Sequence, residues 1–195
     1  SDPAHRETFL SDVRTAIGFA QRLGANQIVV TSGLSAAGRS PEEQYASLTE
    51  GVKRAADLVA AANFTLLVEP LNSLVDHAGC FLTSCVEGLK FVREINHPNV
   101  RLLCDLYHEQ VQRGNVIRTF TEAAPLVGLV HVADNPGRND PGSGEINFTN
   151  VYRAIQQSGY TGRIAMEYRP LGDPVKSLAK AIGDMPIICH PVGTL

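Results

Sequence analysis

Five short runs rich in Val, Ile and Leu recur along this chain, and a stretch with helical periodicity precedes or follows each of them. The runs are Gln27–Thr31, Thr65–Glu69, Val100–Asp105, Leu129–Val132 and Arg163–Glu167. They are almost continuously apolar, which is typical of parallel strands covered on both faces. Their spacing of roughly 25–40 residues is the length of one strand and its crossover helix. The sequence therefore predicts consecutive β/α units.

Helix starts lie between these runs. Ser40–Glu43 has an N-cap serine, a proline at the first helical position and a capping-box glutamate, so a helix is expected from Pro41. Ser84 and Glu87 repeat the capping-box pattern and predict a second helix start. Asp173-Pro174 opens the last helix, and Gly159 ends the helix before it. Repeated β/α units form either an open doubly wound sheet or a closed barrel. At roughly 100–200 residues per domain, residues 1–195 are expected to form a single domain.

Polar side chains stand at the carboxyl ends of four successive predicted strands. They are Glu69, Asp105, His131 and Glu167. Each of them alone is more often a salt-bridge or core residue, but strand ends of a parallel sheet meet at one edge. Three buried carboxylates that meet require a cation. The sequence predicts a divalent metal site, with Mn²⁺ or Mg²⁺ first and Co²⁺ or Zn²⁺ as alternatives.

Composition excludes several other classes of protein. Lys and Arg number 17 against 20 Asp and Glu, and the net charge of -3 argues against nucleic acid as a partner. The sequence has no apolar run of the ~20 residues that cross a bilayer and no signal-like opening, so no membrane association and a cytoplasmic location are expected. The four cysteines are expected to be reduced and mostly buried. They are Cys80, Cys85, Cys104 and Cys189.

Four stretches also carry a family resemblance. LLVEPLN, LLCDLYHEQ, VGLVHVADNPGR with PGSGEINF, and GYTGRIAMEYRP resemble the hydroxypyruvate isomerase branch of the xylose isomerase-like TIM barrels. The likeness covers about residues 6–182 and implies a (β/α)₈ barrel with one divalent metal. It implies metal ligands at Glu69, Asp105, His131 and Glu167, with Glu69 and Glu167 also as the proton-transfer residues. The substrate-binding residues implied by the same motifs are His108 and Arg138. His108 is expected on the loop that follows Asp105.

Two departures accompany the resemblance. Hydroxypyruvate isomerases usually have Gln where His131 stands, whereas epimerases of the superfamily have His. The chain shows about five strands in place of eight, so a TIM-barrel-like fold without its first three β/α units is expected. A barrel typically takes about 250 residues, more than the 195 present. An open edge invites pairing, so a homo-oligomer that covers it is a further expectation.

The expected chemistry is isomerisation of a small sugar or hydroxy-acid through an enediolate, with conversion of hydroxypyruvate to tartronate semialdehyde as the first substrate assignment. The alternatives are a ketose 3-epimerase and a non-catalytic truncated barrel. A DNA-repair endonuclease of the superfamily would need many more histidines than the six present. Glu145 is expected to anchor the loop that bears Arg138, and four further residues are candidates for lining the pocket. They are Asn72, Asp76, His77 and Tyr107.

Overall fold

The computed structural model describes residues 3–185 and contains the predicted parallel sheet. The strands are β1 (Gln27–Thr31), β2 (Thr65–Glu69), β3 (Val100–Asp105), β4 (Val127–Val132) and β5 (Arg163–Met166). All neighbouring pairs are parallel and the strand order is β1-β2-β3-β4-β5. The prediction of five parallel strands is confirmed. Strand β4 begins two residues earlier than predicted and β5 ends one residue earlier, so Glu167 lies just beyond it.

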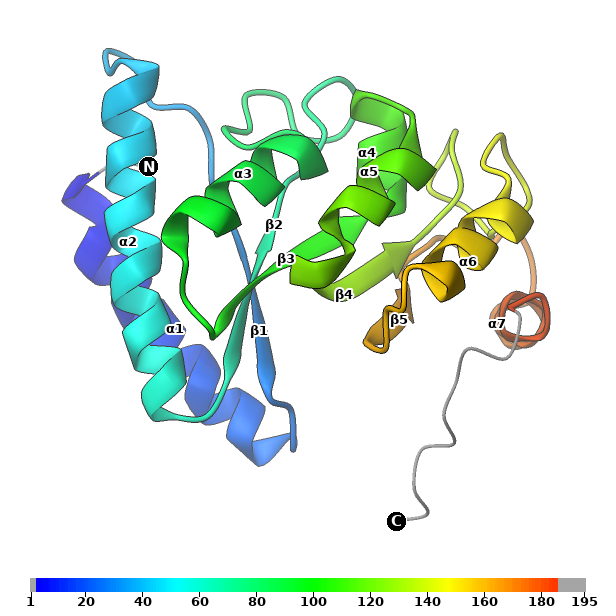
Figure 1. Ribbon diagram of the computed structural model, residues 1–195, viewed down its shortest axis with the longest axis horizontal. Helices are drawn as coiled ribbons and strands as arrows, with labels where there is room; N and C mark the ends of the chain where they lie inside the picture. Colours follow the sequence, from blue (N-terminus) through cyan, green and yellow to red (C-terminus); the bar gives the residue numbers. More distant parts are fainter. Residues whose placement is uncertain (1–2, 186–195) are drawn as a thin grey trace.

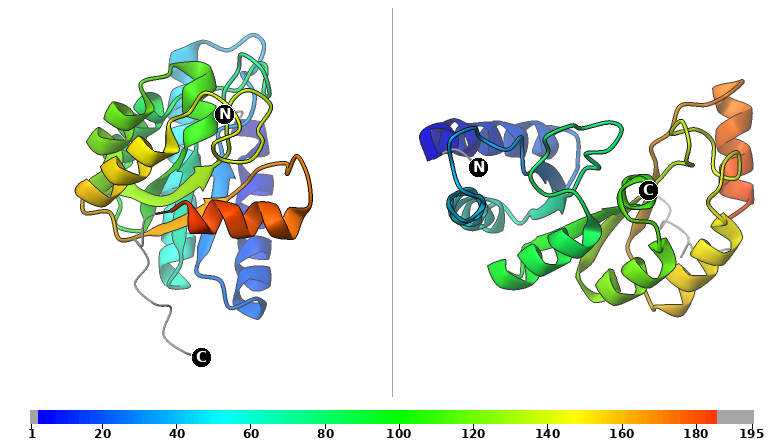
Figure 2. Two further views of the ribbon diagram at one scale, coloured as in Figure 1. Left: turned by 90° about the vertical axis from the view of Figure 1, so that its right-hand side faces the viewer. Right: turned by 90° about the horizontal axis from the view of Figure 1, so that it is seen from above.

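Helices alternate with the strands (Figure 1). The α-helices are α1 (Arg6–Arg22), α2 (Pro41–Ala61), α3 (Cys85–Ile95), α4 (Leu106–Gln112), α5 (Val116–Ala123), α6 (Phe148–Gln157) and α7 (Pro174–Gly183), with short 3₁₀ turns at Pro3–His5 and Ala124–Leu126. Seen from above in Figure 2, the helices follow the outside of a curled sheet, with α1 and α7 at its two ends. The sheet therefore has the curvature of part of a barrel.

The two outer strands each have one neighbour. Within residues 3–185, β1 pairs only with β2 and β5 pairs only with β4. Apolar side chains are exposed on the elements at these two ends. They include Phe19, Leu23, Val29, Val175 and Ile182. Unpaired strand edges beside exposed apolar side chains are surfaces on which further chain can pack.

The core lies between the sheet and the helices on its outer face. Leu66, Leu102 and Val130 from the central strands are completely buried, as are Phe91 of α3 and Phe120 of α5. Burial of side chains on both faces explains why the strands are continuously apolar. The expectation of buried reduced thiols is confirmed for three cysteines, and the fourth lies outside the described residues. The three are Cys80, Cys85 and Cys104.

Most helix boundaries follow the predicted caps. Ser40 and Glu43 form a reciprocal capping box, and the Asp173 side chain caps α7. Gly159 has a φ of 75°, a left-handed conformation that suits the residue after a helix end. The prediction of a second capping box at Ser84 is wrong in one detail. Ser84 caps α3, but the Glu87 carboxylate accepts hydrogen bonds from Thr83.

Gly88 allows α3 to lie directly against the sheet. A Cβ atom at this position would lie 2.5 Å from Pro70 Cγ and 2.7 Å from Leu102 Cδ1. Ala is the better helix former by about 1 kcal/mol, but overpacking costs about 1–3 kcal/mol. We expect Gly88→Ala to lower the free energy of unfolding measured in urea. Gly18→Ala, where a Cβ has open space on α1, should raise it by about 0.5–1 kcal/mol. Stabilisation by both changes would contradict this packing.

Glu109 on α4 is buried, and its Oε2 accepts a hydrogen bond from Cys85 N at 2.7 Å. Burial raises its pKa above the ordinary value. The folded protein therefore holds this proton to higher pH than the unfolded chain, whose glutamate pKa is about 4.3. Below a pH of about 4.3, the protonated Glu109 side chain contributes its full stabilisation to the folded protein. This contribution is lost as pH rises through the pKa that Glu109 has in the folded state. We expect wild type to lose stability relative to Glu109→Gln as pH rises from about 4 through the raised pKa of the folded state. Urea unfolding of both proteins at a series of pH values above about 4 measures the effect. A difference that stays constant, or that favours wild type more as pH rises, would contradict it.

No helix among residues 3–185 is long and apolar enough to cross a membrane. The proline-broken end of the chain, which the sequence marks as unable to continue a helix, lies outside the described residues from residue 186 onward. Met185, just after α7, packs against the core.

Candidate metal centre

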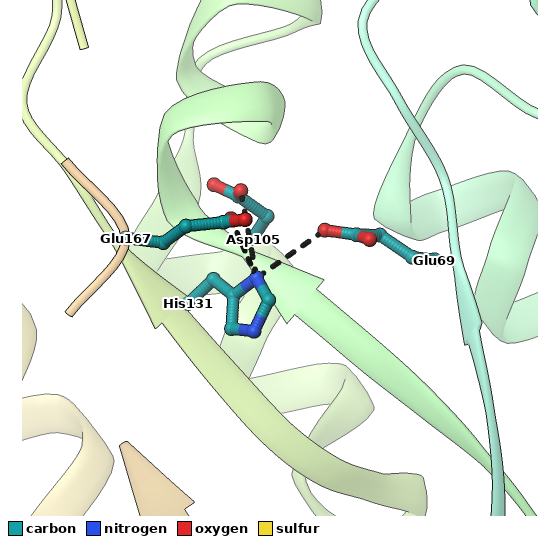
Figure 3. Close-up of side chains that lie close together, drawn as sticks. All are labelled: Glu69, Asp105, His131 and Glu167. Atoms are coloured by element: carbon teal, nitrogen blue, oxygen red, sulfur yellow. Dashed lines mark ion pairs between the residues drawn. The ribbon is translucent and has the colours of Figure 1, made fainter. Parts of the chain in front are cut away.

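Four side chains converge at the carboxyl edge of the sheet (Figure 3). Glu69 ends β2, Asp105 ends β3, His131 lies one residue before the end of β4, and Glu167 follows β5. Parallel register places Asp105 opposite His131 in neighbouring strands. One potential ligand atom from each side chain lies within 4.8 Å of the others. The structure thus brings together all four of the predicted ligands.

His131 is at the centre of this group. Its Nδ1 atom lies 2.8 Å from Glu167 Oε2, 3.4 Å from Glu69 Oε1 and 4.0 Å from Asp105 Oδ2. The Nδ1 atom is buried and makes no hydrogen bond of good geometry. A cation held by all four side chains would satisfy this buried nitrogen and offset the charge of the three carboxylates. Three carboxylate oxygens and one imidazole nitrogen suit a hard or borderline divalent ion, so the residues present fit a metal.

The protonation states reflect this crowding of charge. Burial alone lowers the pKa of His131, but the carboxylates of Glu167 and Glu69 outweigh burial and raise it to about 10. The same contact with His131 lowers the pKa of Glu167 to about 2, despite partial burial. Burial raises the pKa of Asp105 to about 6. Without an added cation, the proton on His131 balances part of the negative charge.

Asp105 also caps the N-terminus of helix α4. Its Oδ1 accepts hydrogen bonds from the backbone N–H groups of Tyr107 and His108, which makes it the N-cap of this helix. The expectation that His108 lies on a loop is therefore wrong, since the residue belongs to the first turn of α4. The cap explains this difference, because an aspartate at a strand end can start a helix at the next residue.

His108 is 2% exposed and faces the metal centre. Its Nε2 lies 3.7 Å from Asp105 Oδ2 and has no hydrogen-bond partner. Burial lowers the pKa of His108 to about 4, and the positive charge of Arg138 adds to the effect. The ring is therefore neutral at neutral pH.

Arg138 reaches the centre from the loop after β4. Its Nη2 lies 2.7 Å from Glu167 Oε2 and 3.4 Å from Asp105 Oδ2, and its guanidinium stacks 5.4 Å from the centroid of the Tyr107 ring. The guanidinium has five N–H donors in a fork that matches a carboxylate. The structure thus places Arg138 where it can contact both the metal ligands and a bound anion.

The loop that bears Arg138 is organised by a residue that sequence reasoning missed. Asp134 is completely buried, and its carboxylate accepts hydrogen bonds from four backbone N–H groups. The four donors are Asn135, Gly142, Gly144 and Ile146. An aspartate before Asn-Pro-Gly is a turn signal that could have revealed it. The expected anchoring role of Glu145 is confirmed, because its Oε1 accepts from Asn135 Nδ2 at 2.5 Å and Gln110 Nε2 at 3.1 Å.

The four further pocket candidates gather around His108. His77 and Tyr107 place their rings 5.3 and 5.4 Å from its ring. Asn72 Nδ2 lies 2.6 Å from His108 Nδ1 and 2.7 Å from Asp76 Oδ2. The structure therefore joins these residues into one network beside the metal centre.

Comparison with known proteins identifies the family of this chain. The family model described as "Xylose isomerase-like TIM barrel" matches residues 1–184. The chain belongs to this family. Hydroxypyruvate isomerase of Escherichia coli (strain K12) is 35% identical to the chain over 168 residues, which cover 86% of this chain and 65% of that protein. The chain thus spans about two thirds of the length of this family member.

Two solved structures share the fold of this chain. A structure described as AP endonuclease, family 2, from Brucella melitensis has a TM-score of 0.85 and 29% identity, covering 92% of this chain and 69% of that one. L-ribulose 3-epimerase has a TM-score of 0.76 and 22% identity, covering 94% of this chain and 61% of that one. The second likeness concerns the fold alone.

Proposed function

We propose that this chain carries the metal centre of an enzyme that isomerises a small hydroxy-carbonyl substrate, with hydroxypyruvate to tartronate semialdehyde as the first assignment. The observation that carries the proposal is the convergence of Glu69, Asp105, His131 and Glu167 within 4.8 Å at the ends of four adjacent strands. The 35% identity to a protein named hydroxypyruvate isomerase supports the substrate class.

The four side chains would hold one divalent ion, Mn²⁺ or Mg²⁺ before Co²⁺ or Zn²⁺ because three of the four donors are carboxylates. When bound, such an ion polarises a substrate carbonyl and stabilises negative charge on the two neighbouring oxygens. The orphaned Nδ1 of His131 supports this assignment, because metal coordination would satisfy an atom that otherwise lacks a good partner.

Glu69 and Glu167 approach the centre from opposite sides (Figure 3) and are the proposed proton-transfer residues. Glu167 is a carboxylate at neutral pH because contact with His131 lowers its pKa to about 2. In the isomerisation, one glutamate removes a proton from the hydroxyl-bearing carbon and the proton returns to the adjacent carbon. The hydroxyl proton moves to the former carbonyl oxygen, so the substrate is rearranged with no net change in atoms.

His108 and Arg138 are the proposed substrate-binding residues. The buried Nε2 of His108 faces the centre without a partner, and such a group can bond a substrate oxygen on which charge develops. Arg138 can bind the carboxylate of a hydroxy-acid through its fork of donors. Both residues border the carboxylates of the metal centre.

Metal removal tests the proposal directly. We expect the purified full chain to bind about one divalent ion and to convert hydroxypyruvate only when loaded, because one ion satisfies the whole ligand set. Elemental analysis measures the stoichiometry, and turnover is followed after chelation and after return of Mn²⁺. Three ions per chain, or turnover that survives complete chelation, would contradict the proposal.

A ketose 3-epimerase is the second candidate, and His131 favours it. The resemblance associates His at this position with epimerases and Gln with hydroxypyruvate isomerases. In an epimerase the second glutamate would return the proton to the opposite face of the same carbon. Reaction in D₂O with a panel of ketoses separates the two, because an isomerase places deuterium on the neighbouring carbon and an epimerase on the inverted one.

The unpaired edges of the sheet raise a third alternative. The chain would then be either a non-catalytic part of a barrel or a part of a barrel that another chain completes. Strands β1 and β5 each pair on one side within residues 3–185. We propose that a homo-oligomer covers these edges. Light scattering combined with turnover tests this, since an active oligomer supports assembly and an inactive well-folded monomer supports the non-catalytic alternative.

A nuclease function receives little support despite the likeness to a structure described as an AP endonuclease. The metal centre contains one histidine among four ligands, and the net charge of the chain is -3. Proteins that bind a phosphate backbone carry concentrated positive charge. A small-molecule substrate therefore fits this chain better than nucleic acid.

A further inference from the structure

The side-chain amide of Asn72 has a fixed orientation. Its Oδ1 accepts hydrogen bonds from the backbone N–H groups of Val75 and Asp76, both at 3.1 Å. Backbone N–H groups only donate, so the oxygen must lie on this side and the NH₂ group on the other. Asn72 is also completely buried. The usual ambiguity between amide oxygen and nitrogen is therefore removed by the local hydrogen bonds.

The NH₂ group of Asn72 points at two neighbours. Nδ2 lies 2.7 Å from Asp76 Oδ2 and 2.6 Å from His108 Nδ1. An amide nitrogen donates and never accepts, so His108 Nδ1 must be the acceptor in this pair. An imidazole that accepts at Nδ1 carries its proton on Nε2. The hydrogen bonds of Asn72 thus select one tautomer of His108.

Asp76 secures the donor side of this arrangement. The same Oδ2 atom that accepts from Asn72 also accepts from the Tyr107 hydroxyl at 2.8 Å. Tyr107 in turn lies beneath the Arg138 guanidinium. The carboxylate is therefore held between the loop after β2 and helix α4, and it keeps the Asn72 amide directed at His108.

The selected proton lies on the atom that faces the metal centre. His108 Nε2 is buried, lies 3.7 Å from Asp105 Oδ2 and has no hydrogen-bond partner. A buried donor without a partner costs about 1–3 kcal/mol, which a ligand that supplies an acceptor would recover.

We propose that Asn72, held by Asp76, is a positioning residue that keeps His108 in the Nε2–H tautomer. The Nε2–H group can then donate a hydrogen bond into the site, so the site selects a substrate with an acceptor oxygen beside His108 Nε2. The carbonyl or carboxylate oxygen of a small hydroxy-carbonyl compound has this chemistry. The inference deepens the proposed function and rests on it for the substrate, whereas the tautomer is a property of the protein alone.

Nitrogen-15 NMR of the labelled full chain tests the tautomer without any turnover. Signals of His108 are assigned by their loss in His108→Gln. We expect a protonated Nε2 and an unprotonated Nδ1 at neutral pH, because Asn72 donates to Nδ1. A proton on Nδ1 in wild type would overturn the proposal, whether or not the Asn72 variant folds.

Asn72→Asp sharpens the test, because it keeps Oδ1 and replaces the donor with an acceptor. We expect a proton to appear on His108 Nδ1 and kcat to fall by about 10-fold or more, while Ser73→Ala on the same loop keeps the wild-type signals. An unchanged tautomer in Asn72→Asp would overturn the proposal. Wild type that shows the expected tautomer but turns over no hydroxy-carbonyl substrate would instead contradict the proposed function and leave the tautomer assignment standing.

Discussion

Glu167→Gln should lower kcat for hydroxypyruvate by about 10²–10⁴-fold, the usual contribution of a positioned acid or base. The carboxylate of Glu167 is anionic because His131 and Arg138 stabilise its charge. Glutamine keeps the size of the side chain but cannot accept a proton from carbon. Glu69→Gln should have an effect of similar size, because Glu69 approaches the same centre from the opposite side.

Loss of metal and loss of a base must be separated in these variants. Kinetics are therefore measured at saturating Mn²⁺, with the metal content of each protein determined in parallel. Glu122→Gln is the matched control, because Glu122 is an exposed residue of α5 that pairs with Arg118. If the double variant Glu69→Gln/Glu167→Gln keeps wild-type turnover with metal bound, the proposed roles are wrong.

Asp134→Ala should lower the free energy of unfolding by about 3 kcal/mol, because several backbone donors would lose their acceptor. Its carboxylate accepts from four N–H groups of the loop between β4 and α6. This loop carries Arg138, so turnover should fall as well. Asp134→Asn should have an intermediate effect, since one amide oxygen can still accept while the amide NH₂ faces other donors.

Urea unfolding followed by circular dichroism measures the change in stability at Asp134. Asp12→Asn on α1 provides a control for the loss of one negative charge, because Asp12 is exposed. A loss of less than 0.5 kcal/mol in Asp134→Ala, the range of ordinary surface changes, would mean that the loop does not depend on this carboxylate.

The sheet could be predicted from sequence because strands that are buried on both faces are almost continuously apolar. The run Thr65–Glu69 predicts β2 with the boundaries that the structure has, and the run Val100–Asp105 does the same for β3. The convergence of Glu69, Asp105 and His131 followed from one rule, that parallel strands end at the same edge. Strand β5 was less well defined, since its residues are only partly buried and its last predicted residue, Glu167, lies outside the ladder.

Contacts between loops could not be predicted in the same way. Asp134 lies among residues that look like an ordinary turn, and its four donors come from positions up to twelve residues away. The link from Asn72 to His108 joins residues 36 positions apart in the chain. No periodicity encodes such a contact, because it depends on the curvature of the sheet and on the path of two loops.

The two oxygens of Asp105 have different partners, so a substitution at this position is expected to disturb both folding and the metal centre. Oδ1 starts helix α4 and Oδ2 faces His131 and Arg138. Asparagine would still cap the helix but would lack the anionic charge, whereas glutamate would keep the charge but is not among the preferred N-caps. Folding and chemistry therefore impose separate demands on one short side chain, and among the twenty amino acids aspartate alone meets both.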